Sequence, residues 1–193
     1  MTITRDKILD CFLDFVETVV VSLAIFFVIY IFIVQPHQVD GHSMDPNLQT
    51  GEYLLTEKIS YRFGQPQRGE VIVFKAPQTA CIGPSCEYIK RIIGLPGETV
   101  KLSEGKIYIN GQPLDESNYL AASVVSMPGA FTAGEREVVL ADDQYFVCGD
   151  NRAGSSDSRH WGPINKQAII GRAYFSYWPV KTFGLIDQGK GEK

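Results

Sequence analysis

Three short segments of this chain carry side chains with the chemistry of hydrolysis. The first is Gly41-His42-Ser43-Met44-Asp45-Pro46, which places a serine hydroxyl in a turn bracketed by glycine and proline. A turn serine is usually only a turn residue. To act as a nucleophile, its hydroxyl needs a base that removes the proton.

Histidine is the usual base for a nucleophilic serine. The chain contains three histidines, His37, His42 and His160. His42 is adjacent to Ser43, so in an extended chain the two side chains would point apart. His37 has no obvious supporting acid, and His160 lies in a charged loop. A Ser-His-Asp arrangement therefore stays open, but nothing in the sequence specifies it.

Lysine is the alternative base, and Lys90 lies in the apolar run Tyr88–Ile93. On a strand, Lys90 shares one face with Tyr88 and Ile92. A free lysine has a pKa near ~10.4, and lowering it to about 7.5 disfavours the charge by about 4 kcal/mol, which burial can supply. The alternative is a strand lysine that extends its amine to solvent.

The third segment is the polar loop 149–159, which follows the apolar run Gln144–Cys148. It contains serines, an asparagine, two aspartates and two arginines. Such a loop can satisfy its own hydrogen bonds, or it can position a hydroxyl or a lysine. Spacing alone does not decide between these roles.

An N-terminal apolar segment must position this chemistry at a membrane. Of the 20 residues from Phe15 to Val34, 17 are apolar. A helix of that length spans ~30 Å, the thickness of a bilayer core. A buried core helix would show a polar stripe, and a cleavable signal peptide would have a shorter apolar run. The segment therefore predicts an uncleaved anchor over residues 15–35, with Pro36 as the helix end.

The cations near this segment predict its orientation. Arg5 and Lys7 precede it, and the next Lys or Arg is Lys58. The positive-inside rule then gives a short cytoplasmic N-terminus, residues 1–14, and an extracytoplasmic domain over residues 36–187. Residues 188–193 are a polar tail that we expect to fray.

The exported part predicts a mainly β domain. Short β-prone runs alternate with Gly and Pro turns at Glu52–Thr56, Glu70–Lys75, Tyr88–Ile93, Thr99–Leu102, Lys106–Asn110, Glu137–Leu140, Gln144–Cys148 and Ile169–Tyr177. This pattern favours an antiparallel β-sandwich or partly closed barrel behind one transmembrane helix. Asn118–Ala133 is predicted to be a surface excursion, and Pro163 to open a short helix over Ile164–Ala168.

Composition excludes several other classes. The chain has 193 residues, 45% of them hydrophobic, which excludes a disordered protein. The formal net charge of -4 argues against a general nucleic-acid binder. Four cysteines are too few for a disulfide-dense mini-protein.

Taken in order, the segments resemble type I signal peptidases, the membrane-anchored Ser/Lys proteases also called leader peptidases. The resemblance rests on the anchor and four motifs behind it: Ser43-Met44-Asp45-Pro46, Arg68-Gly69-Glu70, Lys90-Arg91-Ile92-Ile93-Gly94-Leu95-Pro96-Gly97-Glu98, and Gly149-Asp150-Asn151-Arg152 with Ser156-Asp157-Ser158-Arg159. Each motif alone is modest, but four in this order behind an anchor are highly specific.

The resemblance implies a role for each site residue. Ser43 is the expected nucleophile and Lys90 the expected general base. Ser155 aligns with a serine that orients the lysine amine, Asp157 and Arg159 with an ion pair near the site, and Asp150 with its supporting acid. The Ser43 backbone, the Gly41 region and Met44 are the expected oxyanion and substrate contacts.

Some positions depart from the family pattern. Gly41 stands where many members have a serine that completes the oxyanion hole, so a second donor is unassigned. Asn47 replaces a common threonine, and Glu70 a common aspartate. Cys81 and Cys86 are candidates for a small-loop disulfide outside the cytoplasm, whereas Cys11 is expected to be free and Cys148 buried.

The resemblance also implies partners and place. The expected function is cleavage of signal sequences from translocated preproteins after small residues, usually Ala-x-Ala, with no metal, cofactor or nucleic acid. The expected location is the plasma (inner) membrane or the thylakoid membrane. Two rivals are a self-cleaving repressor-type Ser/Lys protease, which would carry a DNA-binding module, and a non-catalytic anchored module that binds envelope proteins.

Overall fold

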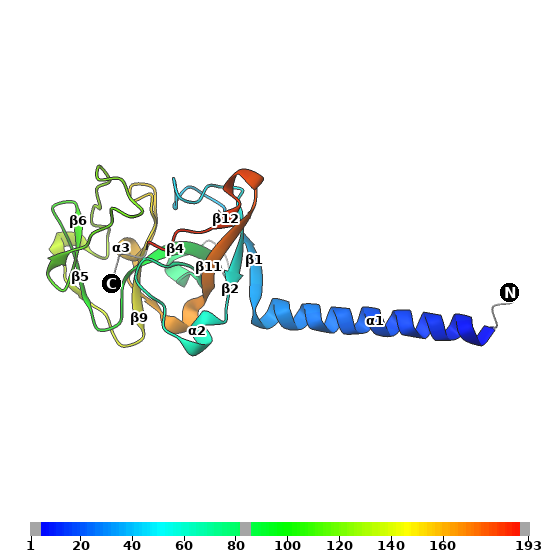
Figure 1. Ribbon diagram of the computed structural model, residues 1–193. Helices are drawn as coiled ribbons and strands as arrows, with labels where there is room; N and C mark the ends of the chain where they lie inside the picture. Colours follow the sequence, from blue (N-terminus) through cyan, green and yellow to red (C-terminus); the bar gives the residue numbers. More distant parts are fainter. Residues whose placement is uncertain (1–4, 82–85, 190–193) are drawn as a thin grey trace.

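The protein consists of one long N-terminal helix and a β-rich body (Figure 1). The computed structural model describes residues 5–81 and 86–189. Helix α1 runs from Arg5 to Phe32, and its stretch Leu9–Phe32 is long and apolar enough to cross a membrane. None of that stretch is buried against the body, which is the arrangement expected of a helix covered by lipid.

The body is built on an eight-stranded sheet whose strand pairs are all antiparallel. The order is β1-β2-β11-β3-β4-β9-β10, with β12 beside β11. The strands are β1 Val34–Gln38, β2 Tyr53–Glu57, β3 Val71–Lys75, β4 Glu87–Gly94, β9 Gln144–Cys148, β10 Ile164–Asn165, β11 Ile169–Trp178 and β12 Gly184–Leu185.

A second, four-stranded antiparallel sheet packs at the end of the body far from α1 (Figure 1). Its order is β7-β6-β5-β8, formed by β5 Thr99–Ser103, β6 Lys106–Ile109, β7 Gln112–Pro113 and β8 Val138–Val139. Short helices connect the strands: α2 Ser60–Phe63, α3 Ser158–Trp161, and the 3-10 turns η1 Gln78–Ala80, η2 Ala133–Glu135, η3 Lys166–Ala168 and η4 Val180–Thr182.

Strands β3 and β4 lie at the centre of the body. Ile72 and Ile92 belong to one apolar cluster, while Val73 and Ile93 belong to two others. Both faces of these strands are therefore covered, which explains why Val71–Phe74 is continuously apolar instead of alternating. Any polar side chain on β4 must find its partners inside the protein.

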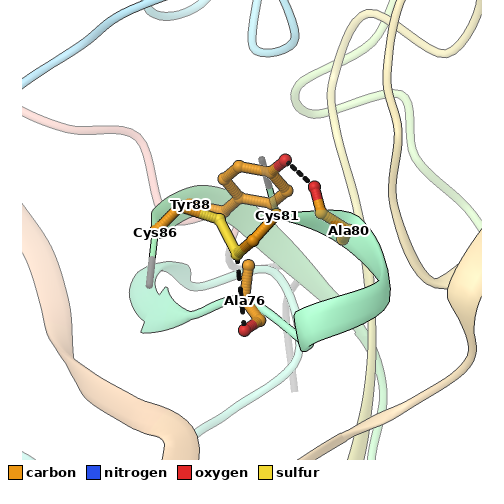
Figure 2. Close-up of a disulfide and its surroundings, with 5 residues drawn as sticks. All are labelled: Ala76, Ala80, Cys81, Cys86 and Tyr88. Atoms are coloured by element: carbon orange, nitrogen blue, oxygen red, sulfur yellow. Dashed lines mark hydrogen bonds between the residues drawn. A yellow bond between two sulfur atoms is a disulfide. The ribbon is translucent and has the colours of Figure 1, made fainter. Parts of the chain in front are cut away.

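Next to the site strand β4, a disulfide joins Cys81 to Cys86 (Figure 2). It ties the end of the β3–β4 connection to the start of β4, with a Cα–Cα distance of 5.8 Å. The Tyr88 hydroxyl donates to the Ala80 carbonyl at 2.6 Å and closes the same connection. Residues 82–85, between the two cysteines, lie outside the described part of the chain. Cys148 is buried and unpaired, and Cys11 is exposed and unpaired, as expected.

The predicted mainly antiparallel β domain behind an apolar helix is confirmed, but the expected helix end at Pro36 is wrong. The helix begins at Arg5 and ends at Phe32, before the expected Pro36. Residues 34–38 instead pair with β2, and Pro36 is tolerated there because β1 is an edge strand.

Two smaller expectations also need correction. Ile164–Asn165 is not helical but pairs with β9, and only Lys166–Ala168 forms a 3-10 turn. The polar tail does not begin to fray at residue 188, because the Gln188 side chain accepts from Val71 N–H and donates to the Ala173 carbonyl. Residues 190–193 lie outside the described part of the chain.

Candidate active site

Ser43 lies in an irregular turn between β1 and β2, which we call the nucleophile turn (residues 41–48). Gly41 begins it with a φ of 98°, a left-handed conformation that glycine adopts without strain. The Gly41 carbonyl accepts from the Thr50 hydroxyl at 2.7 Å. Met44 and Leu48 are 1% and 3% exposed and anchor the turn in the core. The buried neighbour of Ser43 thus fixes where the hydroxyl stands.

Lys90 extends from β4 to that hydroxyl. The distance between Lys90 Nζ and Ser43 Oγ is 2.7 Å, and the amine also donates to the Ile89 carbonyl at 3.0 Å. The side chain is buried beside the Tyr88 ring, whose centroid lies 5.1 Å from Nζ. The structure therefore brings together the two residues that the sequence placed 47 positions apart.

Burial changes the protonation of this amine. Loss of solvation lowers the pKa of Lys90 to about 8, and the nearby Asp157 carboxylate opposes this shift. About a tenth of the amine is then neutral at pH 7, and its nitrogen lies 2.7 Å from the serine oxygen. A neutral amine at that distance can accept the serine proton.

The polar loop 149–159 lies beside the Ser43–Lys90 pair and is held by a buried ion pair, Asp157 with Arg159. Asp157 Oδ1 accepts from Arg159 Nε at 2.8 Å, and Asp157 Oδ2 accepts from Gly149 N–H at 3.0 Å. Although burial acts against it, the Arg159 hydrogen bond keeps the pKa of Asp157 below its usual value. Ser155 is also buried, but among the described residues its hydroxyl makes no hydrogen bond to Lys90.

Asp150 forms a second buried pair, with Arg91. The guanidinium donates from Nε and Nη2 to the two carboxylate oxygens at 2.8 and 2.7 Å, and both side chains are at most 1% exposed. Arg91 lies next to Lys90 on β4, so this pair ties the base strand to the polar loop. Asn47 of the nucleophile turn donates to Asp150 Oδ2 at 2.8 Å and joins the turn to the same pair.

Asn151 clamps the nucleophile turn directly. Its backbone N–H donates to the Ser43 carbonyl at 3.1 Å, and its side-chain amide donates to the His42 carbonyl at 2.9 Å. Gly149 packs so closely that an added Cβ would lie 2.3 Å from the Ser43 carbonyl oxygen. The polar loop therefore fixes both sides of the serine backbone.

A cleft of about 300 Å³ opens over the Ser43–Lys90 pair. One wall is the chain from Gln38 to Ser43, and the other is β4 from Glu87 to Lys90. Met44, Gly154 and Ser156 complete the lining. At the end of the cleft toward α1, His37 Nε2 pairs with Glu87 Oε2 at 3.1 Å.

His37 and His42 pair with acids and not with Ser43. His37 has a supporting acid that the sequence did not reveal, Glu87, and its Nδ1 lies 2.9 Å from the Thr56 hydroxyl. Burial lowers the pKa of His37, and Glu87 opposes this. His42 Nδ1 pairs with Asp45 at 3.0 Å. Among the described residues neither ring hydrogen-bonds to Ser43, and no cluster of three or more His, Cys, Asp or Glu side chains could hold a metal ion.

Three contributors were missed or left without a role by the sequence analysis: Arg91, Asn47 and Asn151. Arg91 was part of a motif and follows the base directly, so a charged residue inside an apolar run was an available signal. Asn47 was noted only as a departure. The contact of Asn151 with a turn more than 100 residues away in the chain required the fold.

Comparison with known proteins places this arrangement in a family. The family model "Signal peptidase, peptidase S26" matches residues 12–178. A probable signal peptidase I-2 of Synechocystis sp. is 41% identical over 179 residues, covering 92% of this chain and 78% of the relative. Signal peptidase I of Leptolyngbya laminosa is 39% identical over 174 residues, covering 89% and 82%.

One further relative and one solved structure are also similar to this chain. Signal peptidase IB of Staphylococcus aureus is 34% identical over 182 residues, covering 89% of this chain and 92% of the relative. A crystal structure of a signal peptidase I from Enterococcus faecalis superposes with a TM-score of 0.44 at 30% identity, covering 56% of this chain and 96% of that one. The chain belongs to the peptidase S26 family and is a hydrolase of the signal peptidase I type.

Proposed function

We propose that the protein is a membrane-anchored serine endopeptidase that uses Ser43 as nucleophile and Lys90 as general base. The observation that carries this proposal is the 2.7 Å contact between Ser43 Oγ and a buried lysine amine. Burying a lysine costs free energy, so a buried lysine is a candidate for a functional role. Here the amine has the serine hydroxyl and one carbonyl as its described partners.

In the proposed reaction, neutral Lys90 takes the proton of Ser43 while Oγ attacks the scissile carbonyl carbon. The carbonyl oxygen becomes an oxyanion, which accepts a hydrogen bond from the Ser43 backbone N–H. The lysine ammonium then gives its proton to the departing amine, leaving an acyl-enzyme. Water attacks the ester while Lys90 accepts its proton. The lysine ammonium then returns that proton to Ser43 Oγ as the acid product leaves, which restores the enzyme.

The buried ions and Ser155 support this chemistry without touching the substrate. We assign Asp157 and Arg159 to holding the polar loop against Gly149, and Asp150 to holding it against Arg91. Ser155 packs against the Gly149 Cβ position and is the expected orienting hydroxyl for the amine. Gly41 offers no side-chain donor to the oxyanion, and no heavy atom beyond its chain neighbours lies within 4 Å of its Cβ position.

The proposed substrate is the signal sequence of a translocated preprotein, cut after small residues of the Ala-x-Ala type. The cleft lies between two extended segments, so an extended peptide can add main-chain hydrogen bonds that do not depend on sequence. Met44 lines the cleft next to Ser43, and we assign it to limiting the side chains beside the cut to small ones.

We further propose that α1 anchors the enzyme in a plasma or thylakoid membrane, with its N-terminal end on the cytoplasmic side. The peptidase domain then follows the anchor on the other side, from Val34 onward. Ten residues, 33–42, separate the end of α1 from Ser43, so the dyad is held close to the membrane surface. Signal peptides remain in the membrane after translocation, and this placement lets the enzyme reach their cleavage sites.

The test is cleavage of a purified preprotein by the wild type and by Ser43→Ala and Lys90→Ala. Loss of the nucleophile or the base should each lower kcat by at least ~10³-fold. Matched controls are Ser117→Ala and Lys106→Ala, which remove the same groups from exposed positions and should cleave at the wild-type rate. Full processing by either dyad variant would refute the dyad and favour a non-catalytic module.

A further inference from the structure

A second depression borders the nucleophile turn on the side away from the substrate cleft; we call it the distal groove. It is lined by Asp45 and Pro46, by Val124, Val125 and Met127, and by the loop around Ala153. Its volume is about 610 Å³. The wall between cleft and groove consists of the nucleophile turn and the neighbouring polar loop, since these segments line both.

The chemistry of the distal groove is that of a peptide-binding surface. Met127 and Val125 are 63% and 54% exposed although both are apolar. Asp45 Oδ1 is buried and has no hydrogen-bond partner among the described residues, while Oδ2 pairs with His42. The groove therefore offers apolar contact area beside a carboxylate whose side chain is 34% exposed.

The direction of the substrate identifies the occupant. Strand β1 continues from α1, so a signal peptide that leaves the membrane enters the cleft at its Gln38 and Glu87 end and reaches Ser43 from there. The chain beyond the scissile bond must then continue away from α1. The excursion that carries Met127 lies beyond the nucleophile turn in that direction (Figure 1). Asp45 follows Ser43 by two residues in the enzyme chain. An extended substrate advances ~3.4 Å per residue, so about three substrate residues beyond the cut would reach Asp45.

We propose that the distal groove binds the first residues of the mature chain, on the carboxyl side of the cleavage site. This inference rests on the proposed function, because it takes the preprotein as the substrate. Apolar side chains at the second to fifth mature positions pack on Val125 and Met127. The Asp45 carboxylate attracts a basic side chain of the same segment.

Two peptides separate this proposal from a general effect on catalysis. The long peptide contains a signal cleavage site and eight mature residues with leucines at the third and fifth, and the short peptide ends after the first mature residue. Val125→Asp and Met127→Asp should lower kcat/KM about tenfold on the long peptide and leave the short peptide unchanged. The matched control Val139→Asp, at a 71% exposed position on β8 of the second sheet, should change neither.

The carboxylate is tested by a preference within one enzyme. Wild type should cleave a long peptide with lysine at the second mature position about fivefold faster than one with glutamate. Asp45→Asn should reduce that ratio to near one. A ratio cancels any general effect of the change on the nucleophile turn.

A binding measurement keeps the proposal independent of activity. The labelled mature octapeptide alone should bind full-length Ser43→Ala protein in detergent micelles, and Met127→Asp added to that protein should weaken binding about tenfold. Equal losses on long and short peptides, or unchanged octapeptide binding, would overturn the proposal. Failure of the wild type to cut any peptide, with octapeptide binding retained, would instead refute the proposed function.

Discussion

The contact of Gly149 with the nucleophile turn provides a sharp test of how the serine is positioned. In Gly149→Ala the new Cβ would lie 2.3 Å from both the Ser43 carbonyl oxygen and Ser155 Oγ. Real Cβ contacts are essentially never closer than 3.0 Å, so the nucleophile turn or the polar loop must move apart. The backbone of Gly149 itself is not in the left-handed region, so alanine adds no torsional strain there.

The size of the movement sets the expected loss. The distance between the new Cβ and the Ser43 carbonyl oxygen must grow from 2.3 Å to more than 3.0 Å, so the turn must move by ~1 Å. A movement of that size between a nucleophile and its base can lower kcat about 100-fold. Overpacking should also lower the free energy of unfolding by about 1–3 kcal/mol. We expect kcat to fall about 100-fold, with a much smaller change in KM.

The assay is steady-state cleavage of a peptide containing one signal cleavage site, with Gly111→Ala as the control. Gly111 has a φ of 78° and no atom within 4 Å of its Cβ position, so this variant carries strain but no collision and is distant from the dyad. It should lose stability and keep its kcat. A Gly149→Ala enzyme with a kcat within about twofold of wild type would refute the positioning role of the polar loop.

Three further changes test the buried groups. Lys90→Met should raise the free energy of unfolding by about 3 kcal/mol near pH 7, because the folded pKa of about 8 lies below the usual lysine pKa of 10.5. This gain should shrink as pH rises from 8 to 10.5, and a pH-independent difference would contradict it. Asp150→Asn should cost about 3 kcal/mol or more in denaturant unfolding, since it leaves the Arg91 guanidinium buried without its charge partner. Replacing Cys81 and Cys86 together by serine should cost about 2 kcal/mol, and reducing agent should lower the Tm of the wild type but not of this variant.

The sequence was sufficient for the parts of the fold that follow a local pattern. The strands around Val71–Lys75 and Gln144–Cys148 were predicted within a residue because apolar runs between turn residues mark buried strands. Strand β1 was missed because its residues Val34–Gln38 are neither alternating nor β-branched throughout. They form a strand only through pairing with β2, which local propensity does not encode.

The site divides in the same way. Ser43 and Lys90 were identified from motif order, and the burial of Lys90 from its apolar neighbours on β4. The Asn151 contact with Ser43 and the pairing of His37 with Glu87 join residues far apart in sequence, so they depend on the tertiary fold. The distal groove also combines three distant segments, and no single one of them carries a signal for it.

Lys90 is the proposed base that titrates during catalysis, and the pKa of its amine can be measured directly. Lysine labelled with ¹³C at Cε can be followed by NMR through a pH titration, with Lys90→Arg used to assign the resonance. We predict that Lys90 titrates at about 8 and that kcat/KM rises with the same apparent pKa before becoming constant. A Lys90 pKa above about 10, or a kcat/KM that does not change between about pH 6 and 10, would contradict the account.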